Sequence, residues 1–376
     1  MQNDNPPTLP PWQQLQVMVL YHLAAPERLV ELIAALDSWI EASGTTLDRA
    51  LDQGRDRAFS DPRWGVRDTP SNWSSYGYGL LLDFRKSTVE ALALREAEIY
   101  RMTGLNGCIR GLQELSLEWM TPDEEHDFQA RIRSVERLAA PLDAVFARPC
   151  QLNDFELTGL VSDLSEHLTT GARLKLHPEI RIKSGQRPSR TGVYVPAELP
   201  AASPQFLWSG DEFGAPGPAW TFNSTGDAAL QHVGRPALWV NKAQMAKFAA
   251  NAVANGLMSV PPPFEAQDVS DADVAGSLVA MQAFEARPSE WIFVELLESD
   301  PDEQASTRVD DSTASEAAKR MEAYAGQPCP RTGWWRTAAR LGERRYVEMG
   351  KPMPDIQSRT HGVIIWYFDD DQRDTL

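Results

Sequence analysis

Cysteine is scarce in this 376-residue sequence, which contains only three. They are Cys108, Cys150 and Cys329, so their number is odd and their spacing is wide. A disulfide framework needs paired cysteines, and a zinc knuckle needs closely spaced ones. We therefore expect three reduced thiols and neither kind of cross-link.

Basic residues are also in deficit, because 36 Lys and Arg stand against 53 Asp and Glu, giving a formal net charge of −17. A protein that binds a phosphate backbone through charge presents a basic surface, and this chain would repel one. The composition therefore argues against nucleic-acid binding and favours a basic partner.

Long apolar runs are missing as well. No stretch offers the roughly 20 apolar residues that span a bilayer. Residues 1–14 (MQNDNPPTLPPWQQ) have neither the basic region nor the apolar region of a secretory signal. We expect a cytoplasmic protein that does not contact a membrane.

Motifs that mark common catalytic sites are absent from the sequence: GxxxxGK[ST], GxSxG, HExxH, an EF-hand loop, and GxGxxG after a strand. The six histidines never stand three to five residues apart, the usual spacing of helical metal ligands. We therefore predict a protein that is not an enzyme and holds no cofactor or metal. An enzyme whose catalytic residues are scattered along the chain stays an open alternative.

Residues 1–170 have the pattern of a helical bundle, with apolar residues at helical spacing after proline or capping signals. The carboxylates that follow Thr121 lie in a first helical turn, where the helix dipole favours them. Helices are expected from Pro26 to Gly44, from Leu80 to Met102, from Thr121 (capping box with Glu124) to about Arg148, and from Asn153 (capping box with Glu156).

Between two of these helices, residues 61–79 (DPRWGVRDTPSNWSSYGYG) are rich in Pro, Gly, Ser and aromatic residues, which predicts a loop. Rings in a loop pack on the core or on a partner, and Trp and Tyr are frequent anchors of protein interfaces. The candidate contact residues of this loop are Trp64, Trp73, Tyr76 and Tyr78.

From Gly171 onward, short strand patterns replace the long helices, and we place a domain boundary between residues 170 and 171. Strands and helices do not alternate regularly there. The predicted fold class is therefore α+β: an N-terminal helical bundle (1–170) followed by a mixed domain (171–376) with a largely antiparallel sheet. Strands are expected at 174–182, 193–195, 206–208, 220–222, 238–240, 291–297 and 363–368, and helices near Asp227 and at 242–255, 268–286 and 314–325.

The second half also holds a strongly acidic segment. Residues 298–311 (ESDPDEQASTRVDD) contain six carboxylates and one cation, Arg308. Such a run is usually a solvated loop, but its charge would also attract a basic partner. The candidate contact residues are Asp300, Asp302, Glu303, Asp310 and Asp311.

Seven segments, taken in order, resemble a known family. They are 192–196 (GVYVP), 205–210 (QFLWSG), 221–223 (TFN), 233–239 (VGRPALW), 329–335 (CPRTGWW), 344–346 (RRY) and 350–354 (GKPMP). They resemble the immunity proteins that protect bacteria against type VI secretion toxins, and the last three are similar to that family's CPxxGWW…RxF…GxxMP segment. Tyr346 stands in place of the phenylalanine. The resemblance covers about residues 185–360, and the helical half matches the first domain of the family's tandem form.

The resemblance implies a protein without catalytic activity that is expressed beside one toxin and blocks it by binding. It carries over no toxin-contacting residue. The motif residues are expected to be structural, with the rings of Trp334 and Trp335 both buried. These residues are Cys329, Gly333, Trp334, Trp335, Arg345, Gly350, Met353 and Pro354.

We therefore predict an immunity protein that neutralises a cognate type VI secretion toxin, a nuclease, by direct occlusion. An adaptor that loads a toxin onto the secretion apparatus and an enzyme of unknown chemistry are the alternatives. The oligomeric state is left open.

Overall fold

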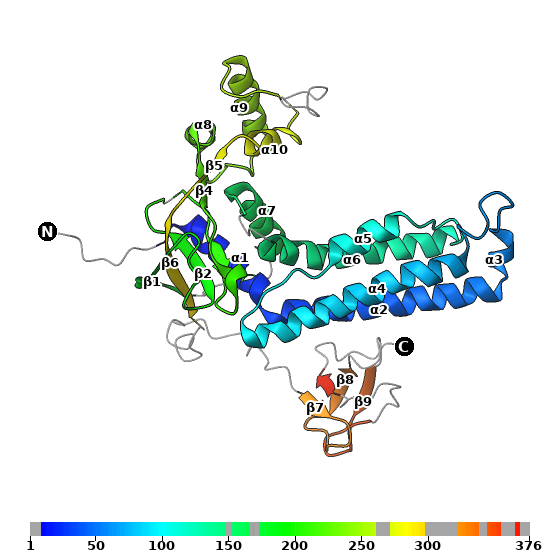
Figure 1. The fold of residues 1–376 in the computed structure, drawn as a ribbon. Coiled ribbons are helices and arrows are strands. Elements are labelled where there is room, and N and C mark those ends of the chain that lie inside the picture. Colours follow the sequence, from blue (N-terminus) through cyan, green and yellow to red (C-terminus); the bar gives the residue numbers. More distant parts are fainter. Residues whose placement is uncertain are drawn as a thin grey trace. The chain divides into compact units, whose positions relative to one another are not determined.

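The fold is α+β, with helices first and antiparallel sheets after them (Figure 1). The computed structural model describes residues 9–147, 152–165, 168, 173–199, 201–260, 271–297, 322–337, 344–354 and 365–368. Contacts divide the chain into two units, Met1–Asp300 and Pro301–Leu376. The predicted boundary at 170/171 marks the change from helices to strands, whereas the contacts separate the units some 130 residues later, between Asp300 and Pro301.

In the helical part of the first unit, the helices after Ala25, Thr121 and Asn153 begin where the start signals predict, whereas the helix expected from Leu80 to Met102 begins at Pro70 and ends at Ala93. The elements of this part are α1 (Pro11–Ala24), α2 (Pro26–Asp52), α3 (Arg55–Ala58), α4 (Pro70–Ala93) with the 3₁₀ helix η1 (Leu94–Ala97), α5 (Leu105–Gln113), α6 (Pro122–Phe146) and α7 (Asp154–Leu164). Both predicted capping boxes, at Thr121 and at Asn153, are confirmed. The predicted end of α2 at Gly44 is wrong. Leu47 and Ala50 continue the buried stripe beyond it, and one glycine inside a helix costs only about 1 kcal/mol.

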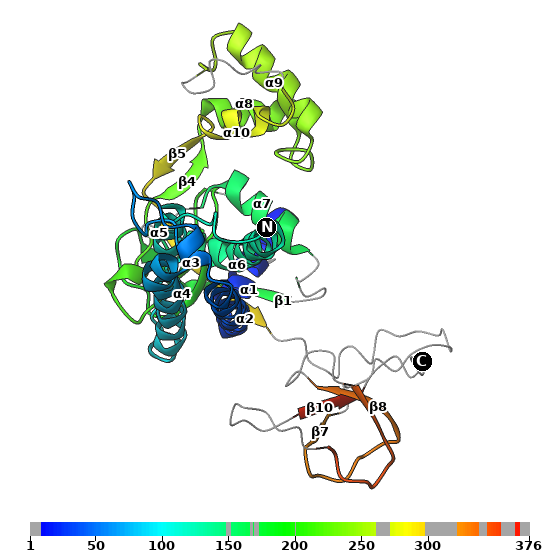
Figure 2. The same ribbon diagram turned by 90° about the vertical axis from the view of Figure 1, so that its right-hand side faces the viewer.

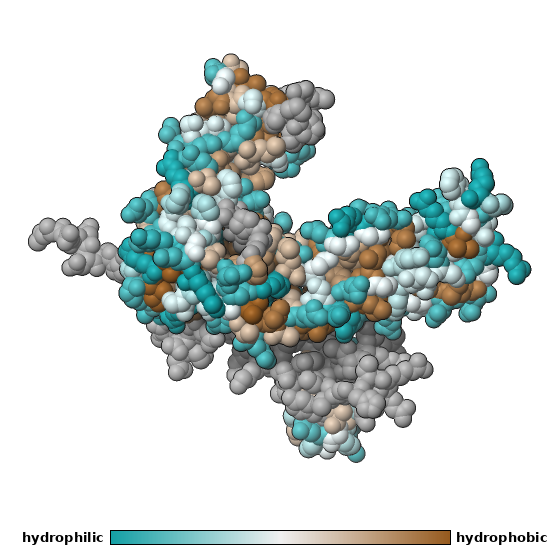
Figure 3. Space-filling model, in the orientation of Figure 1, coloured by the Kyte–Doolittle hydropathy of each residue, from teal (hydrophilic) through white to brown (hydrophobic). Residues whose placement is uncertain are grey.

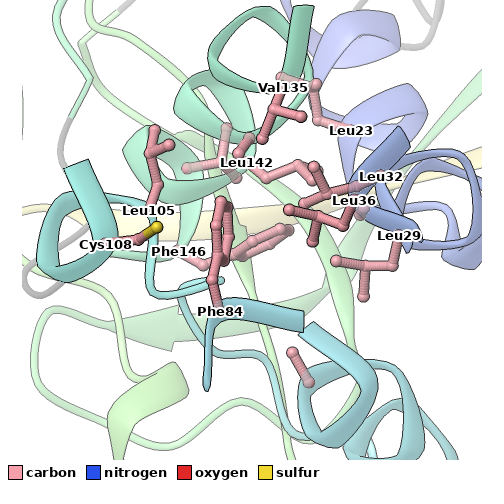
Figure 4. Close-up of a cluster of buried hydrophobic side chains, with 14 of the residues drawn as sticks. Leu23, Leu29, Leu32, Leu36, Phe84, Leu105, Cys108, Val135, Leu142 and Phe146 are labelled. Carbon is pink, nitrogen blue, oxygen red and sulfur yellow. The ribbon is translucent and has the colours of Figure 1, made fainter. Parts of the chain in front are cut away.

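One hydrophobic core joins these helices to the first sheet. Figure 4 shows Leu29, Leu32 and Leu36 of α2 facing Phe84 of α4 and Phe146 of α6. The same cluster of buried side chains continues into the sheet, where its members are Val193, Val195, Phe206, Trp208, Ile292 and Val294. Bundle and sheet therefore stabilise each other.

The first sheet has the strand order β1-β6-β2-β3, and its neighbouring strands are all antiparallel. Its strands are β1 (Arg173–Lys183), β2 (Gly192–Pro196), β3 (Gln205–Leu207) and β6 (Glu290–Leu297). Each was expected from alternating or buried apolar residues, so this part of the prediction is confirmed.

Helix α1 is attached to this sheet by the hydroxyl group of Tyr21. Val193 of β2 and Val294 of β6 are register partners. The Val193 amide donates to Tyr21 Oη at 3.2 Å, and Tyr21 Oη donates to the Val294 carbonyl at 2.5 Å. A Cβ on Gly192 would lie 2.6 Å from this hydroxyl, so the phenol occupies the space that a side chain there would need. The phenol thus completes the pairing of two strands.

The rest of the first unit is a two-stranded ribbon with a small helical cluster beyond it (Figures 1 and 2). Its elements are η3 (Glu212–Gly214), β4 (Ala219–Phe222), α8 (Ser224–Val233), α9 (Lys242–Ala254), α10 (Ala275–Ala280) and β5 (Phe284–Arg287). Helices α8, α9 and α10 share a core of their own. Two expectations are wrong here. Residues 238–240 form turns. Of the helix expected at 268–286, residues 268–270 lie outside the described residues, and within 271–286 it is confined to α10, with 284–286 in β5, which pairs with β4.

A buried carboxylate links this region back to α7. Asp154 is completely buried. Its Oδ1 accepts from Gln16 Nε2 at 2.7 Å and from Arg235 Nη2 at 2.5 Å, and its Oδ2 accepts from Arg235 Nη1 at 2.8 Å and from Trp239 Nε1 at 2.7 Å. Trp239 has a positive φ of 68°, which is rare for a bulky side chain. The four hydrogen bonds thus fix the turn after α8 against α1 and α7.

The second unit contains a four-stranded antiparallel sheet in the order β7-β10-β8-β9. Its strands are β7 (Glu322–Tyr324), β8 (Gly333–Thr337), β9 (Arg344–Val347) and β10 (Ile365–Phe368). The helix expected at 314–325 is wrong at 322–324, which form β7. The strand expected at 363–368 is present from Ile365 onward, and its first two residues lie outside the described residues.

In the described parts of the chain, no helix is long and apolar enough to cross a bilayer.

Candidate partner-binding surface

The acidic contact candidates Asp300, Asp302, Glu303, Asp310 and Asp311 lie outside the described residues. The aromatic candidates all lie within them, at the end of the bundle where α2, α3 and α4 meet (Figure 1). The geometry of this end therefore decides which predicted residues a partner can reach.

Half of the predicted loop 61–79 is helical. The loop ends at Thr69, whose side chain caps α4 by accepting from the Asn72 amide at 3.2 Å, and Pro70 occupies the first helical turn. Proline after a Thr cap is a helix-start signal, and Trp73, Gly77 and Leu81 then follow at helical spacing on the buried face. Trp73, Tyr76 and Tyr78 thus belong to α4.

The helix separates the aromatic candidates into buried and exposed ones. Trp73 is 1 % exposed, and its ring centroid lies 5.7 Å from those of both Trp119 and Phe128. It is a core residue, so the expectation that it contacts a partner is corrected. Tyr78 is half-buried against the same core. Trp64 and Tyr76 are each 65 % exposed.

Trp64 is held by a tight turn. Asp61 and Gly65 exchange two backbone hydrogen bonds, at 2.9 and 2.7 Å, and Asp61 Oδ1 accepts from the amides of Arg63 and Trp64 at 2.6 and 3.3 Å. Gly65 has a φ of 65°, which glycine adopts without strain. A ring presented by a fixed backbone loses less entropy on binding than one on a mobile loop.

Other exposed apolar side chains belong to the same end of the bundle. We call this set the tip surface, and it consists of Leu51, Trp64, Val66 and Tyr76. In Figure 3, apolar surface appears between hydrophilic residues at this end. Exposed aromatic and aliphatic groups on a rigid scaffold are typical of protein-binding surfaces.

An acidic groove of about 460 Å³ lies between α2 and α6. Its charged lining consists of Glu41, Asp123, Glu124, Asp127, Arg49 and Arg131. Asp127 binds Arg131 at 2.8 Å, and Glu124 binds Arg49 and Arg55 at 3.0 and 2.6 Å. Four carboxylates thus face three arginines, and the negative charge exceeds the positive by one. The groove lies next to α3, because Arg55 of α3 donates to Glu124 of α6 at 2.6 Å. A basic partner would meet a complementary field there.

Glu124 is the most strongly perturbed carboxylate of the groove. Partial burial alone would raise its pKa, but hydrogen bonds from Arg55 and Thr121 and the charge of Arg55 outweigh burial and lower the pKa to about 2. Arg49 adds a contact at 3.0 Å, and the Thr121 amide donates at 2.9 Å. Glu124 therefore joins α2, α3 and α6.

Replacing Glu124 with glutamine is expected to lower the free energy of unfolding at pH 7 by about 2 kcal/mol, since two arginines lose their carboxylate. The lowered pKa means that the stabilisation is complete above pH 4.5 and is lost as the pH falls toward 2. Urea titrations at pH 7 and pH 3 measure this. The exposed Glu125→Gln is the matched control, and a Glu124→Gln deficit that does not shrink at pH 3 would contradict the assignment.

Some of the motif residues of the second unit are buried, and others are exposed or lie in turns. Cys329, Trp335 and Met353 are buried in its small core. Trp334 is not buried with Trp335, as had been expected, because successive side chains of a strand point to opposite faces. Its ring centroid lies 5.6 Å from that of Tyr346. Gly333 begins β8 and Gly350 takes a φ of 82° in a turn, whereas Arg345 is exposed and Pro354 is partly buried.

Sequence reasoning missed several residues that the structure brings together. Asp61 and Val66 are only loop composition in the sequence analysis, although Asp-Pro followed by glycine is a turn signal, and Arg55 lies in no predicted element. Asp154 had no signal, because an acidic residue after an N-cap is ordinary. The described residues contain no group of three or more His, Cys, Asp or Glu side chains placed to hold a metal ion.

Comparisons of the chain with protein-family models, with curated proteins and with solved structures found no match.

Proposed function

We propose that this protein is an immunity protein that binds a cognate type VI secretion toxin and blocks it by direct occlusion. The observation that carries the proposal is the tip surface, where the Asp61 turn fixes an exposed Trp64, and the same bundle carries the acidic groove between α2 and α6. Large aromatic anchors next to complementary charge are the features that give protein interfaces their affinity and their association rate.

The family resemblance is the reason for proposing a toxin as the partner of this surface. The resembling segments coincide with strands β2, β3, β4, β8 and β9 and with the turn that holds Asp154, so they belong to the folded core of each unit. We infer that they maintain the scaffold, while the tip surface, which has no counterpart among those segments, selects the toxin.

The proposed toxin is a nuclease, and the proposed compartment is the cytoplasm, where nucleic acid is present. Nucleases carry basic surfaces toward phosphate, and such a surface fits the acidic groove. Inhibition by occupancy requires neither a catalytic group nor a cofactor in this chain.

A titrated protection assay tests the proposal. The protein is purified from its native cells at low salt, and a co-purifying partner is separated and assayed for nuclease activity with increasing amounts of this chain. Loss of activity at a 1:1 ratio is the expected result. Inhibition far below that ratio would indicate an enzyme, and export of the partner without protection would indicate an adaptor.

Truncation of Trp64 to alanine is expected to raise the dissociation constant of the complex by about 30- to 1,000-fold, since an aromatic anchor contributes about 2–4 kcal/mol. Stability should not change, because the ring is exposed. Leu82→Ala is the control, because Leu82, like Trp64, is an exposed apolar residue, but it lies on α4 outside the tip surface. Surface plasmon resonance provides the measurement, and equal affinities for the two variants would remove the tip from the interface.

A further inference from the structure

Strand β1 contains a bulge at the edge of the first sheet. His177 of β1 is the register partner of Phe293, and Arg181 is the register partner of Ile292. Because Phe293 and Ile292 are consecutive in β6, residues 178–180 of β1 have no partner in that strand. β1 stands at one end of the strand order, so the bulge lies in an edge strand. Bulges in such strands often redirect a side chain for a purpose.

The imidazole of His177 connects this bulge to β6. Its Nδ1 lies 2.7 Å from Oε1 of Glu179, which belongs to the bulge, and its Nε2 lies 2.8 Å from Oε2 of Glu295, which belongs to β6. The His177 side chain is 10 % exposed, whereas those of Glu179 and Glu295 are 67 % and 32 % exposed. One nearly buried ring therefore holds two carboxylates that reach the solvent.

The two contacts together require a proton on each ring nitrogen. An ionised carboxylate only accepts hydrogen bonds, and a neutral imidazole has a single N–H. The hydrogen bond from His177 lowers the pKa of Glu295, and the charges of His177, Arg190 and Lys175 lower it further. The pKa of Glu179 is also lowered, by a hydrogen bond from its own amide and by the one from His177. Both carboxyls are thus ionised near neutral pH, and only the imidazolium can bind both.

The other titratable groups around the ring keep their charge near neutral pH. Tyr21 and Tyr194 stay uncharged, because burial raises the pKa of each phenol to about 12. Arg190 lies over the Phe293 ring, which His177 also contacts. The full set of groups consists of Lys175, Glu179 and Arg181 of β1, Glu290 and Glu295 of β6, Arg190, Tyr194 and Tyr21. Histidine is the residue type that changes charge in this range, so His177 sets the local charge.

Loss of the ring proton affects the two carboxylates unequally. Glu295 is fixed in β6 opposite its register partner Lys175, and the charge of Arg190 also acts on it. Glu179 is mostly exposed, and its backbone has no partner in β6, so water replaces the contact to His177 at little cost. The remaining N–H therefore stays with Glu295, and Glu179 is released.

We propose that His177 is a pH-sensitive switch of the β1 bulge. The imidazolium holds residues 178–180 against β6, and the neutral ring keeps Glu295 and frees Glu179 with the bulge. A fall in pH closes the bulge and a rise opens it. This inference does not depend on the immunity proposal, since it concerns residues outside the tip surface and the acidic groove, and its test contains no toxin.

The test is an NMR titration of the full-length protein from pH 5.5 to pH 8.5. Ring ¹⁵N spectra show which nitrogens of His177 carry a proton, and amide spectra follow Glu179 and Ile180. Both nitrogens should be protonated at pH 5.5. As the ring loses a proton, the two amides should shift with the same midpoint, and their hydrogen exchange, corrected for its intrinsic pH dependence, should become about tenfold faster, the effect of losing one hydrogen bond to a charged group. A singly protonated ring at pH 5.5, or amides that do not follow its titration, would overturn the proposal.

A pair of variants completes the test. Glu179→Gln places an amide opposite Nδ1, and an amide can either accept from the imidazolium or donate to the neutral ring. The bulge should then stay closed, and its amides should lose their response to pH. Glu198→Gln is the matched control, because Glu198 is an exposed carboxylate after β2 that makes no contact with His177, and it should keep the wild-type response. Both positions are exposed, so the fold should be retained. Equal responses of the two variants would contradict the assignment.

Discussion

Replacement of Asp154 by asparagine is expected to lower the free energy of unfolding of the first unit by about 3–5 kcal/mol, the usual cost of removing one partner from a buried ion pair. The variant leaves Arg235 without a counter-charge. It also replaces one acceptor oxygen with an NH2 donor that faces other donors. Urea denaturation followed by circular dichroism measures the loss. Asp163→Asn, an exposed position on the same helix, is the control and should be neutral within about 0.5 kcal/mol.

The pairing itself is tested by a second substitution. In the Asp154→Asn background, Arg235→Met removes the orphaned cation and should recover more than 1 kcal/mol of the loss, because buried ion pairs are often replaced by apolar residues at little cost. If the double variant loses as much stability as the Asp154→Asn and Arg235→Met single variants lose together, Asp154 does not act through Arg235.

Removal of the Tyr21 hydroxyl is expected to cost about 2–6 kcal/mol, since a Tyr21→Phe variant leaves the Val193 amide and the Val294 carbonyl without their partner, at about 1–3 kcal/mol each. Tyr76→Phe removes the same atom from an exposed ring and should have no effect on stability. Urea denaturation of both variants gives the comparison, and equal stability would mean that the strands pair directly once the hydroxyl is gone.

The same residue predicts a change in alkaline stability. Burial raises the pKa of Tyr21 to about 12, whereas its ordinary value is 10. Between these values the unfolded chain loses the phenol proton and the folded chain keeps it, so stability falls as the pH rises from 10 to 12. Tyr21→Phe should show a shallower fall than the wild-type protein over this interval.

Local signals predicted much of the fold. The capping boxes at Thr121 and Asn153 fixed helix starts to the residue, because the reciprocal hydrogen bonds involve only four consecutive positions. Helix ends were less predictable. The continuation of α2 past Gly44 depends on Leu47 meeting the core, which is a tertiary contact.

The candidate site shows the same limit. Trp64 and Trp73 are nine positions apart and of the same type, yet one is exposed and the other is buried, because the start of α4 sets which face each residue occupies. Gln16 and Arg235, which bind Asp154, lie 138 and 81 residues away from it in the chain, so no local pattern could predict these contacts. Composition predicted an acidic, aromatic surface, and only the fold could select its residues.

The core shared by the bundle and the first sheet constrains how the chain can be made. Strand β6 contributes Ile292 and Val294 to the core that begins with Val17 of α1. During synthesis, the helices emerge from the ribosome long before β6, so their apolar faces stay uncovered while more than a hundred further residues are added. Nascent chains with such late-closing cores are the usual clients of chaperones. Release of the first three hundred residues therefore marks the earliest point at which the first unit can reach its native state.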